Sequence, residues 1–146
     1  MTAATGIGAR VLRTEDKRFL TGTGRYVDDL PLARATYAYF LRSPHAHAKI
    51  KKLDISAAAK MSGVVNIFTG KDLVDAKVGG LICGWVVKDK HGEPHKAPPH
   101  PVMAVDTVRY VGDTVAMVVA NSYDEAKDAA EAIKVDYDVQ PANIDL

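Results

Sequence analysis

The apolar segment Thr114–Ala120, which reads TVAMVVA, constrains the fold of this chain more than any other feature. A strand with one solvent-exposed face alternates apolar and polar residues, whereas an apolar run without such alternation indicates a strand that is buried on both faces. The segment is therefore predicted to be the central strand of a sheet.

A helix is predicted directly after this strand, over residues 122–134. Ser122 and Glu125 have the S-x-x-E spacing of a capping box, in which side chains satisfy the free backbone amides of a helix start. An amphipathic helix must also place its apolar side chains on one stripe. That stripe is formed here by Tyr123, Ala126, Ala129, Ala130 and Ile133.

The other expected elements are shorter, and their order indicates an α+β fold. The expected order is strand, strand, helix, strand, and this order then occurs a second time. It lacks the regular alternation of strands and helices that a doubly wound sheet requires. The expected elements are a largely buried strand over 36–42, a strand from His47 with a bulge near Lys51, a short helix over 57–59 capped by Ser56 and ended by Gly63, a strand over 64–68 closed by Thr69 and Gly70, a strand over 102–111, and a last strand burying Val135, Tyr137 and Val139.

Two segments show no sustained apolar period. Residues 1–30 are expected to form an extended N-terminal arm with turns, and residues 73–101, which are rich in glycine and proline, a long loop. Loops of that length in a compact domain are usually functional, mobile or part of an interface. The 146 residues as a whole fit a single domain, 1–146, with one core.

Charge and composition exclude several classes of partner. Nineteen basic and eighteen acidic side chains leave a formal net charge of +1, so no overall field would hold a nucleic acid. The lysines at 49, 51 and 52 alternate with apolar residues, as on a solvated strand face. One cysteine excludes an internal disulfide, and neither a signal peptide nor a membrane span is visible. We therefore expect a cytoplasmic protein.

Three histidines, His91, His95 and His100, share the long loop and are the strongest candidates for a metal site. Gly92 and Pro94 argue against a helix that would align the first two, and no cysteine lies beside them. A polar, exposed loop is the favoured interpretation, and a small metal-binding protein stays open as an alternative.

The remaining candidates have a structural explanation, so we expect no catalytic, cofactor-binding or metal-binding residue in this chain. A catalytic Cys83 would need a basic neighbour, and the pair His45 and His47 is an incomplete ligand set. The glycine pairs at 6 and 8 and at 22 and 24 lack the third glycine of a phosphate loop. The carboxylate pairs Asp28-Asp29 and Asp136/Asp138 fit a turn and a strand alternation.

Five blocks of sequence in order resemble the opening of the large subunits of molybdenum hydroxylases, the family of xanthine dehydrogenase, aldehyde oxidase and carbon monoxide dehydrogenase. Two departures from the family pattern are small. Asp113-Thr114 stands where the family commonly has Glu-Pro, and Gln140-Pro141 stands where it typically has Leu-Pro. Neither substitution is expected to change the fold. The blocks are FLTGTGRYVDDL (19–30), LRSPHAHAKI (41–50) with Asp54 and Ser56, GVVNIFTGKD (63–72), VRYVGDTVA (108–116), and Ala126, Ala129 and Ala130 with VDYD (135–138).

The resemblance implies an α/β-hammerhead domain, with mixed strands in two layers and a few helices on one side. It implies a parent enzyme that uses a molybdenum–pterin centre together with iron–sulfur and FAD partners, and a natural chain that continues beyond Leu146. No position of this chain matches the family's pterin-contacting or catalytic segments, so the isolated chain is expected to be inactive. A free-standing binding module of the same fold is the competing interpretation.

Overall fold

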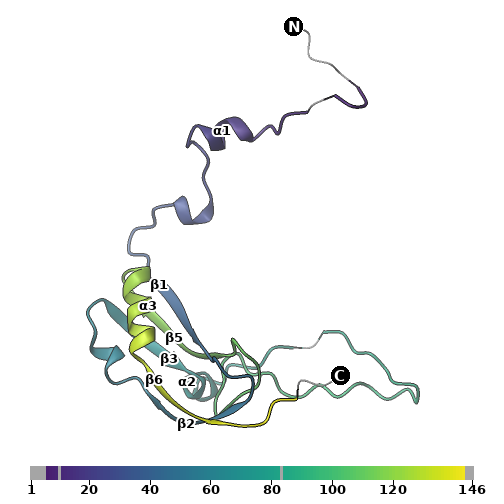
Figure 1. The fold of residues 1–146 in the computed structure, drawn as a ribbon, viewed down its shortest axis with the longest axis vertical. Helices are drawn as coiled ribbons and strands as arrows, with labels where there is room; N and C mark the ends of the chain where they lie inside the picture. Colours follow the sequence, from purple (N-terminus) through teal and green to yellow (C-terminus); the bar gives the residue numbers. More distant parts are fainter. Residues whose placement is uncertain (1–5, 10, 83, 144–146) are drawn as a thin grey trace. The chain divides into compact units, whose positions relative to one another are not determined.

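The computed structural model describes residues 6–9, 11–82 and 84–143. The chain divides into two compact units, Met1–Arg34 and Ala35–Leu146. The boundary lies close to the end of the predicted arm, and each unit is described by itself. Helices and strands are labelled as in Figure 1.

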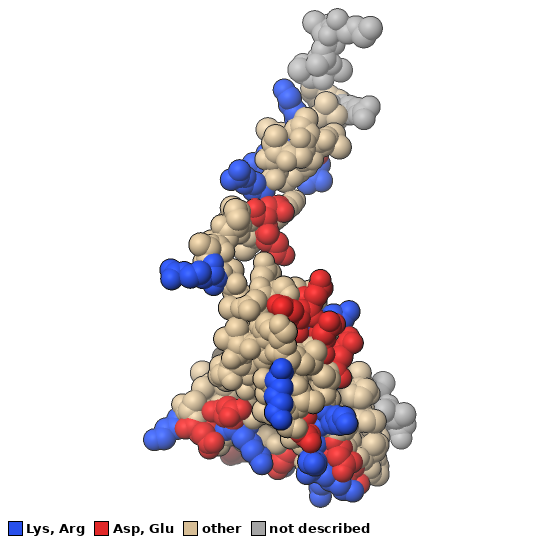
Figure 2. Space-filling model, turned by 90° about the vertical axis from the view of Figure 1, so that its left-hand side faces the viewer, with Lys and Arg blue, Asp and Glu red and all other residues tan. Residues whose placement is uncertain are grey.

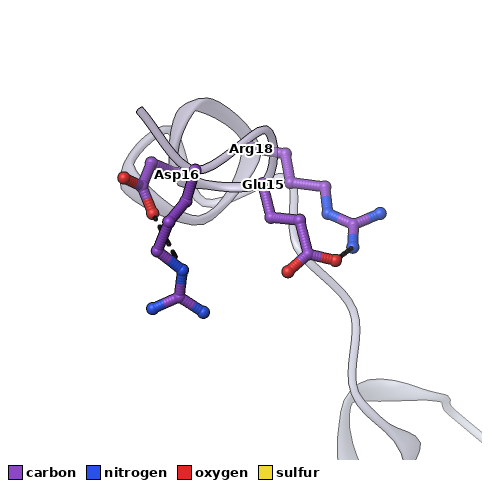
Figure 3. A network of polar contacts seen from close by, with 4 residues as sticks. Glu15, Asp16 and Arg18 are labelled. Atoms are coloured by element: carbon purple, nitrogen blue, oxygen red, sulfur yellow. Dashed lines mark hydrogen bonds and ion pairs between the residues drawn. The ribbon is translucent and has the colours of Figure 1, made fainter. Parts of the chain in front are cut away.

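The N-terminal unit contains a short helix, α1 (Asp16–Leu20), and a 3-10 turn, η1 (Val27–Asp29), so the prediction of an arm with turns alone missed a helix. Two ion pairs brace the helix: Arg18 with Glu15 at 3.0 Å and Arg13 with Asp16 at 3.9 Å (Figure 3). The rings of Phe19 and Tyr26 stack with centroids 5.4 Å apart. Such exposed pairs add little stability, and neither helix buries a residue.

The first sheet of the second unit has the strand order β1-β5-β3 and is antiparallel throughout. It consists of β1 (Tyr37–Arg42), β5 (Thr114–Ala120) and β3 (Val64–Thr69). The prediction that 114–120 is a central strand is confirmed. Val118 of β5 is fully buried and lies opposite Tyr39 on one side and Ile67 on the other.

The second sheet has the order β4-β2-β6, formed by β4 (Thr107–Val108), β2 (Ala48–Asp54) and β6 (Lys134–Val139). The register between β2 and β6 shifts between Ile50 and Lys52, which confirms the predicted irregularity. The strand expected over 102–111 is wrong except for its two residues in β4. Met103 and Ala104 are buried by packing, so their apolar character does not mark a continuous ladder.

Helix α3 (Tyr123–Ala132) follows β5 as predicted and packs on β1 and β5 (Figure 1). Ser122 is the N-cap, and its hydroxyl oxygen accepts the amide proton of Glu125 at 3.2 Å. Ala126 and Ala130 are fully buried, because small side chains let the helix approach the sheet closely. Tyr123 was predicted to belong to the buried stripe but remains 52% exposed at its edge.

Sheet residues point into two adjoining clusters. The larger lies between α3 and the first sheet and includes Ala116 and Val118, whereas Val115 points the other way into a second cluster with Val108. Leu53 contacts both clusters and connects them. The core therefore continues from one sheet to the other.

The face of the first sheet that is turned away from α3 is apolar and only partly covered. Phe40 and Phe68 lie opposite Met117 from the two flanking strands, so the three side chains share this face. Phe40 is 42% exposed, and β1 is an edge strand with no fully buried residue. The expectation that 36–42 is largely buried is therefore wrong.

The short elements between β2 and β5 differ from the prediction in their caps. The short helix expected over 57–59 is a 3-10 helix, η2 (Ala58–Lys60), which Ser56 does not cap because its hydroxyl donates to Asp54 at 2.6 Å. Gly63 has the expected left-handed backbone, with φ of +80°. A helix, α2 (Gly70–Asp75), begins where only a turn was expected; Thr69 is its N-cap, and the Asp72 carboxylate accepts hydrogen bonds from the Thr69 amide and hydroxyl.

The last strand follows the predicted alternation except at its end. Val135 and Tyr137 are half-buried, but Val139, which was expected in the core, is 61% exposed. Beyond β6, the amide of Gln140 donates to the carbonyl oxygen of His47 at 2.9 Å. This bond ties the end of the strand to the approach to β2.

Candidate functional site

Most of the predicted long loop is an irregular hairpin over residues 81–100. Its base is closed by the amide of Leu81, which donates to the carbonyl oxygen of His100 at 2.8 Å. Further out, the backbone amide of His95 donates to the carbonyl oxygen of Val87 at 2.9 Å, and the amide of Asp89 donates to the carbonyl oxygen of Glu93 at 2.8 Å. The two limbs leave the sheets as the teal and green extension in Figure 1. The described residues of this segment, 81–82 and 84–100, therefore form a hydrogen-bonded protrusion.

The three loop histidines do not converge. The amide of His91 donates to the Asp89 carboxylate at 2.8 Å in the turn at the tip, and Nδ1 of His95 accepts the Val87 amide at 3.0 Å. The His100 ring packs edge-on against Tyr110 at the base, with centroids 6.2 Å apart. Among the described residues, no group of three or more histidine, cysteine, aspartate or glutamate side chains could hold a metal ion.

The two histidines before β2, His45 and His47, make separate contacts. The His45 ring lies edge-on against Tyr137 with centroids 4.9 Å apart, and Nδ1 of His47 lies 2.9 Å from the carbonyl oxygen of Pro141. Both residues precede β2, so the strand geometry that would place them on one side does not apply. Their partners point to a packing role.

The donors of the chain do not suit the cofactors that the sequence resemblance implies. An iron–sulfur cluster needs four cysteine or histidine ligands, and the one cysteine, Cys83, lies outside the described residues. Gly22 follows the C-terminal end of α1, whereas a phosphate-binding loop precedes the start of a helix. No chemical step through a metal, flavin or pterin is therefore derived from this chain.

A polar turn with a buried aspartate, which the sequence patterns did not indicate, links β1 to β5. Asp113 is 7% exposed, and its carboxylate accepts the Arg109 amide at 3.0 Å. The amide of Ser43 donates to the Asp113 carbonyl oxygen at 2.8 Å. Loss of hydration, assisted by the Asp113 charge, raises the pKa of both Tyr110 and Tyr137. The sequence signal was the Gly112-Asp113 turn, which does not reveal burial.

This turn does not have the geometry of a nucleophilic site. The Ser43 hydroxyl donates to the His45 carbonyl oxygen at 3.1 Å and accepts the His45 amide at 3.0 Å. A nucleophile–base pair would require a hydrogen bond from the hydroxyl to the imidazole ring. The arrangement instead satisfies backbone groups at the end of an edge strand.

A cleft lies between the base of the hairpin and this turn. It encloses about 620 Å³ and has an apolar wall that includes Ile82, Pro98 and Pro99. Lys96 and Arg109 also line it. A second hollow of about 640 Å³ adjoins it across the same prolines. The two hollows share Pro98, Pro99 and Arg109 among their lining residues.

The surface charge is mixed. Lysine and arginine side chains are interspersed with carboxylates on the face of the molecule drawn in Figure 2. On β2, Lys51 pairs with Asp138 at 3.6 Å and Lys52 with Asp54 at 3.5 Å, and all three lysines of this strand are exposed, as expected. No helix in the described ranges is long and apolar enough to cross a membrane.

Comparison with known proteins identifies the family. Residues 21–141 match the family model described as aldehyde oxidase and xanthine dehydrogenase, a/b hammerhead domain. The chain is 41% identical over 127 residues to the nicotine 6-hydroxylase large subunit of Paenarthrobacter nicotinovorans, covering 87% of the chain and 15% of that protein. It is 36% identical over 141 residues to the carbon monoxide dehydrogenase large chain of Afipia carboxidovorans, covering 96% of this chain and 16% of that protein.

A solved structure gives the same result. The crystal structure of quinoline 2-oxidoreductase from Pseudomonas putida 86 superposes with a TM-score of 0.73 at 39% identity, covering 92% of this chain and 16% of that one. The chain thus spans less than a fifth of the length of these relatives. Its two small antiparallel sheets with few helices confirm the predicted α+β hammerhead fold. The chain belongs to the a/b hammerhead domain family of aldehyde oxidases and xanthine dehydrogenases.

Proposed function

We propose that this chain is the N-terminal structural domain of the large subunit of a molybdenum hydroxylase, of the carbon monoxide or aldehyde dehydrogenase type. The proposal rests on how much of this chain, and how little of its relatives, the sequence matches cover. The family match extends over residues 21–141, nearly the whole chain, yet the same alignment accounts for 16% of a carbon monoxide dehydrogenase large chain. The chemistry is assigned to the remaining part of such a subunit.

The exposed apolar surface of the second unit supports this proposal. Phe40 remains 42% exposed on the uncovered sheet face, and Ile82 and Trp85 on the hairpin are 93% and 78% exposed. Large apolar side chains are thus left exposed on the sheet and on the hairpin, where they can contact another part of the protein. Covering them with the rest of a large subunit would remove this surface from water and stabilise the position of the domain.

The domain's role in this proposal is to pack and to position, and it provides no residue to the reaction. The proposed parent enzyme holds molybdenum–pterin in the remainder of the large subunit and receives iron–sulfur and FAD groups from partner subunits. A cytoplasmic location belongs to the same proposal, because a chain with one cysteine has no internal disulfide to gain from an oxidising compartment.

The test is to isolate the native protein that contains this sequence. An epitope tag placed before Met1 would be used to purify it, and the mass of the tagged polypeptide and its molybdenum and iron content would be measured. We expect a polypeptide several times longer than 146 residues that copurifies with molybdenum and iron. A tagged polypeptide that ends at Leu146 and carries no metal would instead support a free-standing binding module.

A further inference from the structure

The cleft between the hairpin base and the turn at 109–113 combines an apolar wall with two cations. Lys96 and Arg109 line it, and the described part of the chain places no carboxylate within 4.0 Å of either charged group. Asp113, the acidic residue of the cleft, is buried and accepts the backbone amide of Arg109. Both cations therefore remain available to an anion from outside this domain.

The cleft is already formed in this domain. Gly80 lies so close to the other limb that an added Cβ atom would come 2.6 Å from the carbonyl oxygen of His100. The Leu81 amide donates to that same oxygen, and the His100 ring packs on Tyr110 across the cleft. Prolines at 98, 99 and 101 restrict the backbone of this wall. A partner would bind without ordering the cleft, which favours affinity.

The adjoining hollow continues the apolar surface. It runs from the same proline wall to Val74 and Val78, which are 56% and 50% exposed. The two hollows, about 640 and 620 Å³, each have the volume of a typical ligand pocket and form one trough. The two hollows share Leu81, His100 and Arg109 among their lining residues, so a ligand that fills both must be elongated, as an extended peptide is.

We propose that this trough binds a segment of the remaining large-subunit polypeptide in which an aspartate or glutamate is flanked by apolar side chains. The inference rests on the proposed function. The carboxylate pairs with Arg109 and Lys96, and the apolar neighbours cover the proline wall and Val74. Arginine suits this role because its planar guanidinium forms two parallel hydrogen bonds with one carboxylate.

Carbodiimide cross-linking of the purified native protein tests the pairing, because the reagent joins an amine directly to a contacting carboxylate. Mass spectrometry should find Lys96 joined to an aspartate or glutamate of the large subunit beyond residue 146, and Lys96→Arg should abolish that link. Lys127 and Glu131, which lie 4.0 Å apart on α3, provide the positive control. A Lys96 link to another subunit, or no Lys96 link beside an intact control link, would overturn the proposal.

A second measurement uses Arg109 in the same native protein. In Arg109→Gln, amides of residues 95–97 and 100 should exchange hydrogen about tenfold faster, because a charge-assisted contact is lost. Arg109→Lys keeps the charge but loses the two parallel hydrogen bonds, so its exchange should lie between that of the unchanged protein and that of Arg109→Gln, and both variants keep the backbone bond to Asp113. Equal exchange in all three proteins would overturn the proposal. The length of the purified polypeptide tests the proposed function separately.

Discussion

Gly70→Ala should destabilise the second unit, because the added methyl group has no room. Gly70 is the first residue of α2 and is buried against the segment before β4. An added Cβ atom would lie 2.3 Å from the Ala104 carbonyl oxygen and 2.8 Å from its carbonyl carbon. Favourable contacts between heavy atoms begin at about 3.5 Å, so α2 and the neighbouring backbone must separate by roughly 1 Å.

The magnitude follows from two opposing effects. Overpacking a well-packed site costs about 1–3 kcal/mol, and replacing a helical glycine with alanine returns about 0.5–1 kcal/mol. The difference between these ranges is about 0–2.5 kcal/mol, and we expect a loss of about 1–2 kcal/mol because the clashing atoms are backbone atoms that no rotamer change can move. The strain would reach the second core cluster, because Ala104 packs there with Val108 and Val115.

Urea denaturation followed by far-ultraviolet circular dichroism measures this loss. With a slope of about 2 kcal/mol per molar, the midpoint should fall by roughly 0.5–1 M. Gly79→Ala is the matched control, because its Cβ would meet nothing within 4 Å and its backbone is not left-handed. If Gly70→Ala proved as stable as Gly79→Ala, the close packing of α2 on the segment before β4 would be refuted.

Three further substitutions test local structure. Ser122→Ala should cost about 0.5–2 kcal/mol in the same assay, because the N-cap of α3 is lost; an unchanged midpoint would argue against the cap. Gly63→Ala should cost about 1–2 kcal/mol, because φ is +80°, and equal stability would contradict that backbone. Hydrogen bonds from the Ser56 hydroxyl and from its backbone amide, together with the nearby Lys52 charge, lower the pKa of Asp54 from 3.8 to about 2, so the resulting stabilisation is complete above pH 3.8 and disappears as the pH falls toward 2. Ser56→Ala should raise the pKa of Asp54 toward 3.8 in an NMR titration. An unchanged pKa would show that the Ser56 hydroxyl does not lower it.

The parts of the fold that local chemistry determines were predictable from the sequence. β5 and α3 carry strong signals, an unbroken apolar run and a capping serine three residues before a glutamate. The helix at α2 was missed because Thr69-Gly70 resembles a turn, although Thr69 and Asp72 have the same capping spacing. The strand expected over 102–111 was wrong because Met103 and Ala104 are buried by tertiary packing without belonging to a strand ladder.

The trough could not be predicted, because three separate segments of the chain form it. Leu81, Lys96 and Arg109 lie far apart in sequence, and only the closure of the hairpin base brings them to one cleft. The histidines illustrate the same limit. Their proximity in sequence suggested a metal site, whereas the hairpin places His91 at the tip and His100 at the base.

We propose that this domain positions the rest of a catalytic subunit and contributes no redox chemistry of its own. The most direct test is to purify residues 1–146 alone from a host that makes the molybdenum cofactor, and to measure bound molybdenum and the reduction of a dye by carbon monoxide, aldehydes or N-heterocycles. We predict no stoichiometric molybdenum and no turnover above background. Stoichiometric molybdenum together with turnover would contradict the account, because it would place the active site within this chain.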